Sequence, residues 1–520
     1  MTHRFRMRPR RWQLLTLFAA TAAASALIAV PMASGAATPQ ATATNVVTTT
    51  HVAAPVLPVV SCASLTADDL STLKDAPTSI TSAREVAATS TTPAYCDILG
   101  YVAPQIQFEV RLPLATWNGD FFQTGCGGFC GSIPISSCSA SLSSNFAVAA
   151  ENSGHVGTDG LWAFNNRSAE IDFGYRSPHV VALASKALIK EFYGQGPHYS
   201  YYDGCSTGGR QALSEAQRYP HDFNGIVAGD PAMQQNYLAP ISQGWVERVN
   251  RDKNGNLILT DSQLPLIHNA VLAACDGIDG HLDGVLDDAS KCHWSPTTLT
   301  CKANEDPTLC LTPAQVKVAE DFYSGPKNSR GQVLMPGLPL GSELGWAGTD
   351  IGTNTTLSGA GGFATQVLRY LAFQKDAGPT YDIDDFNLNT DIPKLDYMAK
   401  IFNATNPDLT AFKAAGGKLI LYHGGADPLI SPQDSVNYFN DVQKLMGGTN
   451  KTGSFFRFFV LPGVFHCTGG AGADTVNWMS YIQAWVEGGT APASITATKV
   501  ANGTVTMTRV LRPYPQSPLQ

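Results

Sequence analysis

The sequence predicts an α/β protein in which a mostly parallel sheet is interrupted by a large insertion. Short apolar segments alternate with amphipathic segments up to about residue 232, and again from residue 418 onwards. Such alternation is typical of a parallel sheet, because a helix usually connects two parallel strands. Between these parts the alternation fades, and Gly, Asp and Asn become frequent. With 520 residues, of which 44% are hydrophobic and 15% charged, the chain can bury a sizeable core.

The N-terminus has the features of an export signal. Five arginines between Arg4 and Arg11 precede an apolar stretch from Leu14 to Val30, and small residues at 34–36 offer a cleavage site. We therefore predict a signal peptide at 1–36, a linker rich in Ala, Thr, Val and Pro at 37–60, and a secreted protein, either extracellular or periplasmic. An uncleaved membrane anchor is the alternative, although the apolar stretch is short and rich in Ala.

Charge and hydropathy exclude some partners. The net charge is −8, and no run rich in Lys or Arg follows the first residues, so nucleic acid is not an expected partner. No later segment is long and apolar enough to span a bilayer, so we expect no stable membrane association after signal cleavage.

Apolar runs and helical periodicity divide the mature chain into a main domain, residues 61–232 and 405–520, and an insertion, residues 233–404. The predicted strands of the main domain are Ile106–Leu112, Phe146–Ala150, Tyr199–Tyr202, Phe223–Ala228, Lys418–Tyr422 and Phe455–Leu461. Its predicted helices are Val180–Phe192, Gln211–Arg218, Gln433–Leu445 and Thr475–Glu487.

Ser206 is the candidate nucleophile. Gly204-Cys205-Ser206-Thr207-Gly208 fits the pattern G-x-S-x-G and lies between a predicted strand and a predicted helix. A sharp strand-to-helix turn leaves no room for side chains at the flanking positions, so glycines occupy them and the serine hydroxyl stands exposed above the sheet. The helix behind it offers backbone N–H groups to a developing oxyanion.

Asp427 and His466 follow Ser206 in the chain order of an α/β-hydrolase triad. Asp427 lies in the loop after the strand Lys418–Tyr422, where the triad acid of this fold belongs. His466 follows the next strand, where the base belongs. We therefore predict an α/β-hydrolase fold whose main domain is catalytic and whose insertion is a lid, with His466 as general base and Asp427 as the residue that orients it.

Eleven cysteines in an exported protein predict disulfides, with at least one thiol left over. Assembly of the triad would bring together Cys205, which precedes Ser206, and Cys467, which follows His466, so a disulfide would join the two loops. Short spacings favour three local pairs, and among Cys126, Cys130 and Cys138 we expect one pair and one free thiol. Structural zinc is the alternative, but it is disfavoured because no C-x-x-C pair occurs. The three local pairs are Cys62 with Cys96, Cys275 with Cys292 and Cys301 with Cys310.

The segment Phe121–Gly131 is a glycine-rich loop that precedes the nucleophile, where a hydrolase of this fold carries the second half of its oxyanion hole. Gly127 or Gly128 would let the backbone approach a substrate, and Thr207, after the nucleophile, would supply the other N–H group. A phosphate-binding loop is the alternative, but no G-K-[ST] follows the glycines.

At this point the sequence resembles the tannase and feruloyl esterase family. Cys205-Ser206, Asp427 and His466-Cys467 are similar to its CS–D–HC signature, and the segment Asp222–Ala232 is similar to the stretch after its nucleophile helix. Trp117-Asn118-Gly119 and Tyr422-His423-Gly424 add to the resemblance, which extends from about Cys62 to the C-terminus.

The resemblance implies a carboxylic ester hydrolase that acts on esters of aromatic acids: feruloyl and other hydroxycinnamoyl esters or galloyl esters, as small molecules or as plant cell-wall and polyphenol esters. It implies that Gly128 and Thr207 are the oxyanion donors and that the Cys205–Cys467 disulfide is a family trait. One bacterial branch hydrolyses mono(2-hydroxyethyl) terephthalate, whose carboxylate is held by an Arg of the lid. Gln366 lies near that position here, and Thr207 replaces an acid of that branch, so this substrate is disfavoured.

The segment Cys275–Asp288 contains five aspartates, which repel one another unless a cation neutralises them. A solvated acidic turn is the alternative, and no Glu stands where a true EF-hand needs it. The family lid carries a structural calcium at this segment. Carried over by resemblance, the ligands are the side chains of Asp276, Asp279 and Asp283 and the backbone carbonyls of His281 and Val285.

The insertion also contains candidate substrate contacts. Phe363, Tyr370 and Phe373 are aromatic residues at helical spacing, although such a stripe belongs to a core more often than to a pocket. Two rival functions remain at this stage: a calcium-stabilised binding protein on an inactive hydrolase fold, and a peptidase or lipase on the same fold.

Overall fold

The structure is a computed structural model that describes residues 55–516. The predicted signal peptide and most of the predicted linker lie outside the described residues. The last residues of that linker hydrogen-bond to the main domain: Val56 N–H donates to Trp117 O, and Val59 N–H to Phe192 O. No helix among residues 55–516 has the length and apolarity that a membrane span requires.

A nine-stranded sheet forms the centre of the main domain, with the strand order β1-β2-β3-β5-β4-β6-β7-β8-β9. The strands from β5 to β9 pair in parallel, whereas β1, β2, β3 and β5 pair antiparallel along one edge. The sheet is therefore mostly parallel, as predicted. Its strands are β1 (Thr78–Val86), β2 (Tyr95–Val102), β3 (Ile106–Pro113), β4 (Phe121–Thr124), β5 (Ala147–Glu151), β6 (Ser200–Cys205), β7 (Gly225–Gly229), β8 (Lys418–Gly424) and β9 (Phe456–Leu461).

All six predicted strands are present, and the sheet contains others that were not predicted. The prediction of a loop at Phe121–Thr124 is wrong, because these four residues form β4 and are all buried. A strand buried on both faces shows no alternation, and one this short resembles the start of a glycine-rich loop. The edge strand β1 is half exposed and rich in Ser and Thr, so its apolar signal is weak. The hairpin of β10 (Ile495–Ala501) and β11 (Thr504–Leu511) was also missed.

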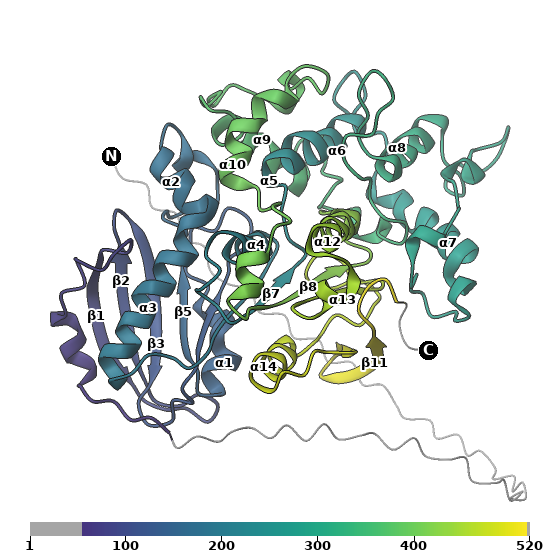
Figure 1. Cartoon of the computed structure of the whole chain (residues 1–520). Coiled ribbons are helices and arrows are strands. Elements are labelled where there is room, and N and C mark those ends of the chain that lie inside the picture. Colours follow the sequence, from purple (N-terminus) through teal and green to yellow (C-terminus); the bar gives the residue numbers. More distant parts are fainter. Residues whose placement is uncertain (1–54, 517–520) are drawn as a thin grey trace, which may run out of the picture. The chain divides into compact units, whose positions relative to one another are not determined.

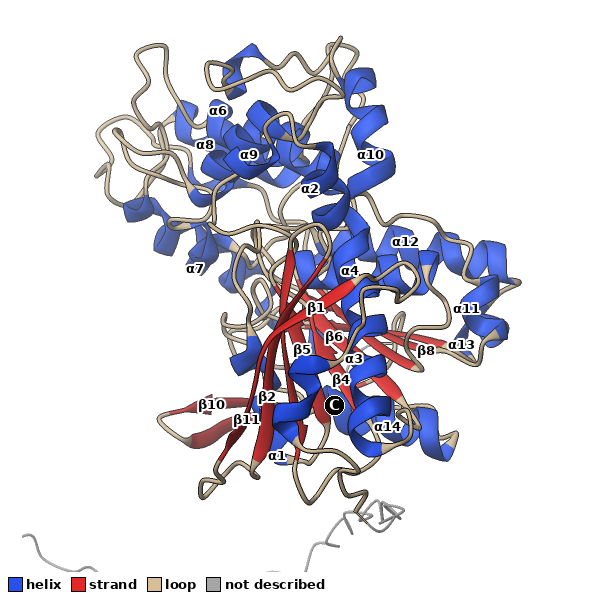
Figure 2. Cartoon of the chain, turned by 90° about the vertical axis from the view of Figure 1, so that its left-hand side faces the viewer, coloured by secondary structure: helices blue, strands red, loops and turns tan. Residues whose placement is uncertain are grey.

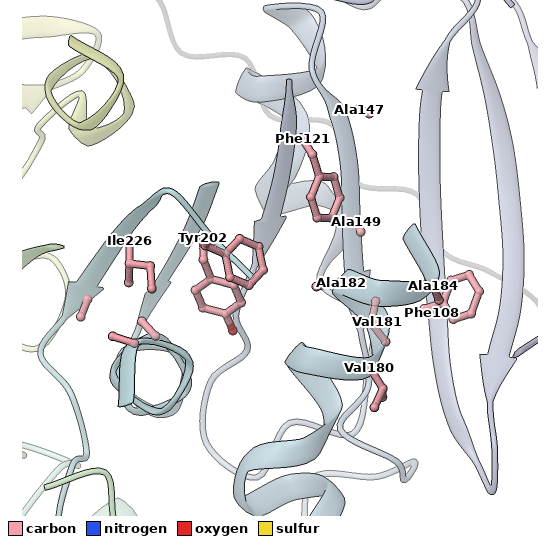
Figure 3. Packing of buried hydrophobic residues seen from close by; sticks show 14 of the residues in the cluster. Phe108, Phe121, Ala147, Ala149, Val180, Val181, Ala182, Ala184, Tyr202 and Ile226 are labelled. Atoms are coloured by element: carbon pink, nitrogen blue, oxygen red, sulfur yellow. The ribbon is translucent and has the colours of Figure 1, made fainter. Parts of the chain in front are cut away.

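Helices cover both faces of the sheet. Successive residues of a strand point to opposite faces, so apolar side chains on both faces have to be buried. Ile226 and Leu419 pack with α3 (Ser177–Tyr193), α4 (Thr207–Arg218) and α12 (Pro432–Met446). Figure 3 shows part of this cluster, in which Val180–Ala184 of α3 approach Phe108 of β3. Val227 and Ile420 belong to a second cluster, which includes α14 (Trp478–Gly488). The short helices of the main domain are α1 (Ser139–Ser143), α2 (Arg167–Ile171), α11 (Thr410–Ala414) and α13 (Thr449–Gly453).

Residues 233–404 connect β7 to β8 and contain helices but no strand. These helices gather beyond one end of the sheet, where α6 contacts both α9 and α8 (Figures 1 and 2). One hydrophobic cluster lies wholly within the insertion, and a second combines insertion residues with Phe129 and Phe173 of the main domain. Its helices are α5 (Gln235–Tyr237), α6 (Gly244–Val249), α7 (Leu264–Cys275), α8 (Pro313–Ser324), α9 (Gly359–Tyr370) and α10 (Asp396–Phe402).

Candidate active site

Ser206 stands at the turn between β6 and α4, in a backbone conformation that side-chain-bearing residues rarely adopt. Its φ and ψ angles are 64° and −120°. The neighbouring glycines are required by space: a Cβ on Gly204 would lie 2.7 Å from the carbonyl of Gly208, and one on Gly209 would lie 2.2 Å from Gly229 O. The turn also hydrogen-bonds to the next strand, because Ser206 N–H donates to Gly229 O over 2.9 Å. The sheet and helix therefore hold Ser206 in a fixed, strained position.

Asp427 and His466 are hydrogen-bonded to each other at the ends of β8 and β9. His466 Nδ1 lies 2.7 Å from Asp427 Oδ2. The other oxygen, Oδ1, accepts the backbone N–H groups of Leu429 and Ile430 at 2.8 and 3.0 Å. Burial would raise the pKa of Asp427, but His466 and His423 outweigh it and hold the pKa below its usual range. Asp427 is therefore an anion that fixes the imidazole of His466.

His466 is bonded to Asp427 through one ring nitrogen and leaves the other without a partner. Burial would lower its pKa, but the charge of Asp427 outweighs burial and raises the pKa to about 9. Its second nitrogen, Nε2, is buried and has no hydrogen-bond partner. Ser206 and His466 line the same cavity, which has a volume of about 800 Å³. The imidazole that is bonded to Asp427 thus lies at a cavity that also contains the serine, and its Nε2 has no other partner.

A disulfide joins the two loops that carry Ser206 and His466. Cys205 and Cys467 are bonded, with 6.0 Å between their Cα atoms. This pairing was predicted, and so were the three local pairs, Cys62–Cys96, Cys275–Cys292 and Cys301–Cys310. Among the remaining three cysteines, Cys126 pairs with Cys130, and Cys138 is a buried free thiol, which gives the expected one pair and one thiol.

The glycine-rich loop, here Gly125–Gly131, follows β4 and lies beside the nucleophile turn. The Cys126–Cys130 disulfide closes it around Gly127 and Gly128. Gly128 has a φ of 57°, and an added Cβ would contact nothing within 4 Å, so glycine is favoured there by backbone conformation rather than by space. The hydroxyl of Thr207 donates to Gly128 O over 2.7 Å and ties the loop to the first residue of α4. The first N–H groups of a helix have no acceptor within it and are available to a ligand.

The cavity around Ser206 is lined by loops of the main domain, including the glycine-rich loop, and by residues of the insertion. Phe363 lines it and stacks on Phe129 with 4.2 Å between the ring centroids. The other two aromatic candidates belong to the core of the insertion: Tyr370 is buried, and Phe373 packs against Tyr381. Gln366 lies in a neighbouring pocket of about 410 Å³. Several lining residues carried no motif and were missed by the sequence analysis: Gln235, Leu238, Gln243, Thr349 and Ala360.

The acidic loop, residues 276–288, holds its carboxylates with backbone N–H groups and with cationic side chains. Asp276 is buried and accepts the N–H groups of Gly284 and Val285 at 3.1 and 3.2 Å. Arg509 of β11 donates to Asp283 and, over 2.6 Å, to Asp287. Burial and the charges of Asp279 and Asp283 raise the pKa of Asp287, although Arg509 opposes this. Arg509 contacts two carboxylates of the loop, and Lys291 contacts a third, that of Asp288. Carboxylate oxygens are hard donor atoms of the kind that calcium prefers.

Other groups of possible metal ligands exist among residues 55–516. Three sets place their donor atoms within 4.8 Å of one another, and the acidic loop is not among them. In one set both sulfur atoms belong to the Cys205–Cys467 disulfide, so they are not thiolate ligands. The sets are Cys205, Asp230 and Cys467; His179, Glu215 and Asp222; and Asp230, His423 and Asp427.

Comparison with known proteins identifies several relatives. A family model described as "Tannase and feruloyl esterase" matches residues 89–520. A probable feruloyl esterase B-2 from Neosartorya fischeri is 33% identical over 418 residues, which cover 77% of each chain. Feruloyl esterase C from Talaromyces stipitatus is 32% identical and is matched over 77% of this chain and 76% of its own.

Two solved structures of esterases match this chain over most of its length. The crystal structure of feruloyl esterase B from Aspergillus oryzae matches with a TM-score of 0.76 and 29% identity, over 85% of this chain and 93% of that one. Tannin acyl hydrolase from Aspergillus niger matches with a TM-score of 0.69 at 22% identity, over 86% of this chain and 88% of that one, which shows a shared fold.

Proposed function

The chain belongs to the tannase and feruloyl esterase family, and we propose that it is a secreted serine esterase that cleaves esters of aromatic acids. One observation carries the chemistry: the His466 imidazole is bonded through Nδ1 to the buried Asp427 carboxylate, while its Nε2 is unpartnered at the cavity that Ser206 lines. This arrangement suits transfer of the serine proton to the imidazole.

In the proposed mechanism Ser206 Oγ attacks the ester carbonyl while His466 Nε2 takes its proton. Asp427 stabilises the imidazolium that forms and keeps its Nδ1 proton in place. The imidazolium then protonates the leaving alcohol, and an acyl-enzyme on Ser206 remains. A water molecule, deprotonated by His466, hydrolyses the acyl-enzyme and releases the aromatic acid.

The backbone N–H groups of Gly128 and Thr207 are the proposed oxyanion donors. Their loops are connected by the hydrogen bond from the Thr207 hydroxyl to Gly128 O. Two disulfides, Cys126–Cys130 and Cys205–Cys467, hold the two loops on either side of this bond. Donors that are fixed before the reaction stabilise the developing charge without a cost of reorganisation in the transition state.

The insertion is the proposed lid, because its residues complete the cavity around Ser206. Leu238, Ala360 and Phe363 offer apolar contacts to an aromatic ring. The described lining residues include no Arg or Lys, so no such side chain is placed to hold a substrate carboxylate. The site therefore favours feruloyl, other hydroxycinnamoyl or galloyl esters, from small molecules or plant polymers, over mono(2-hydroxyethyl) terephthalate.

Calcium is the proposed structural cofactor of the acidic loop. Asp276, Asp279 and Asp283, with the carbonyls of His281 and Val285, would hold it, and the donor set fits because every ligand is a hard oxygen. The ion would neutralise the carboxylates and stiffen the loop, with no part in the reaction.

An ester panel tests the proposed function. Methyl ferulate, methyl p-coumarate, methyl gallate and mono(2-hydroxyethyl) terephthalate are compared on the wild type and on Ser206→Ala, whose fold is checked by circular dichroism. We expect turnover of at least one of the first three esters, and a loss of about 10⁵-fold or more in Ser206→Ala. An equally active Ser206→Ala variant, or a wild type that a fluorophosphonate probe does not label at Ser206, would overturn the mechanism. The second result would favour a binding protein on an inactive hydrolase fold.

A further inference from the structure

Asp427 has a second imidazole beside it. His423, in β8, is fully buried, and its Nε2 lies 3.2 Å from Asp427 Oδ2, the same oxygen that accepts the bond from His466. His423 is not among the residues that line the cavity around Ser206. It therefore contacts the proposed triad acid without lining the cavity where a substrate would bind.

The surroundings of His423 fix where its proton lies. Nε2 faces three acceptors: Ile430 O at 3.0 Å, Asp427 Oδ2, and Asp230 Oδ1 at 3.6 Å. Because all three are acceptors, Nε2 must carry a proton. Nδ1 lies 2.7 Å from the hydroxyl of Ser435, which is able to donate to it or accept from it. In both the neutral Nε2–H form and the imidazolium, Nε2–H therefore donates to Ile430 O and lies beside the Asp427 carboxylate.

Charged groups reach His423 from every neighbouring element. Asp230 follows β7, Asp427 follows β8, Asp434 is in α12, and His466 follows β9. Burial would lower the pKa of His423, but Asp230 and Asp427 outweigh burial and raise it. Burial raises the pKa of Asp434 to about 6, against the opposing charge of His423. The charge of Asp427 is thus shared between two imidazoles, and only His466 reaches the cavity.

We propose that His423 is a positioning residue for the reaction: its Nε2–H group holds the Asp427 carboxylate in place and limits how strongly that carboxylate attracts a proton onto His466. This inference rests on the proposed triad. Without His423, Oδ2 would lose one of the two imidazole N–H groups beside it, and the full charge of Asp427 would act on His466. The base would then stay protonated to a higher pH, and the carboxylate would be held only by His466 and the N–H groups of Leu429 and Ile430.

The experiment compares His423→Leu, which has no donor, with His423→Gln, whose amide N–H group is able to replace Nε2–H. For each variant kcat and KM are measured on an ester that the wild type hydrolyses, across pH 5 to 10. The second-order rate of Ser206 labelling by a fluorophosphonate is measured over the same range. Circular dichroism and thermal unfolding report the fold. A third variant, Ser435→Ala, leaves His423 in place and removes only the partner of Nδ1.

For His423→Leu we expect kcat to fall about tenfold or more with KM unchanged, and the acid limb of both pH profiles to move to higher pH. We expect His423→Gln to recover most of kcat, and Ser435→Ala to keep kcat within about threefold.

The proposal is overturned if a folded His423→Leu keeps the wild-type kcat and acid limb, or if the Leu and Gln variants lose the same activity with no shift of the limb. If His423→Leu does not fold, the Gln and Ser435 variants decide: loss of activity in His423→Gln with an unmoved limb overturns it. Failure of the wild type to be labelled at Ser206 would instead reject the triad itself.

Discussion

Asp427, after β8, and Asp283, in the acidic loop, are both carboxylates beside a cationic group, but their surroundings differ. Asp427 is fully buried, and its partners are two imidazoles and two backbone N–H groups supplied by the ends of β8 and β9 and the turn after β8. Asp283 is exposed and contacts the N–H group of Val285 in its own loop and Arg509 of a distant hairpin. The ends of the strands therefore supply the groups that stabilise the charge of Asp427, whereas Asp283 depends on a guanidinium from outside its own loop.

This difference separates chemistry from stability. Replacing Asp427 leaves a buried histidine pair without its counter-charge, so the effect should appear in the rate. The acidic loop is a partly exposed part of the insertion, away from Ser206. Replacing one of its carboxylates should therefore change the unfolding temperature rather than the rate.

Asp427→Asn should lower kcat/KM by about 10³- to 10⁴-fold, because the amide neither stabilises the imidazolium nor keeps the required tautomer of His466. The pKa of His466 should fall from its raised value of about 9 toward its usual range, because the charge of Asp427 is what raises it. The base must be neutral to work, so the acid limb of kcat/KM should move to lower pH in the variant. Steady-state kinetics between pH 5 and 10 measure both effects.

The matched control is Asp434→Asn, which alters a buried acid near His423 that does not contact the base. We expect it to keep kcat/KM within about tenfold. An Asp427→Asn variant with an unmoved acid limb would contradict the assignment of Asp427 as the partner of His466.

The placement of Ser206, Asp427 and His466 at strand ends and the Cys205–Cys467 disulfide could be predicted from the sequence, but the lining of the cavity could not. Ser206, Asp427 and His466 each follow a buried strand, and parallel strands bring their carboxyl ends to one edge, so order along the chain was enough. The residues Gln235, Leu238 and Thr349 come from irregular parts of the insertion, where no periodicity indicates which side chains face the serine. The contact between His423 and Asp427 was also invisible, because β8 is buried throughout and shows no alternating pattern.

Removing the Cys205–Cys467 disulfide should cost more stability than removing Cys301–Cys310, a disulfide of the insertion. The first closes a segment of 262 residues and the second one of 9. Loop-closure entropy alone makes the first about 3 kcal/mol more stabilising. We expect Cys205→Ser/Cys467→Ser to lower both the Tm and kcat, since it also loosens the register of Ser206 and His466. Cys301→Ser/Cys310→Ser should leave kcat unchanged. Equal losses of kcat in the two double variants would show that the first disulfide has no role in holding the site.

Removal of calcium should have the smallest effect on the rate and a clear effect on stability. If the acidic loop binds the ion, saturating calcium at about 100 times its Kd stabilises the fold by about 2.7 kcal/mol, so EGTA should lower the Tm by a few degrees.

Asp279→Asn should lower the Tm in calcium and make it insensitive to EGTA, because one ligand and its charge are lost. Asp288→Asn, an acid of the same loop outside the proposed ligand set, should keep the response to EGTA. Arg509 already neutralises part of the loop through Asp283 and Asp287, so the protein should remain folded and active at 25 °C without the ion. A Tm that does not respond to calcium or EGTA in the wild type would identify the segment as a solvated acidic turn held by Arg509 without an ion.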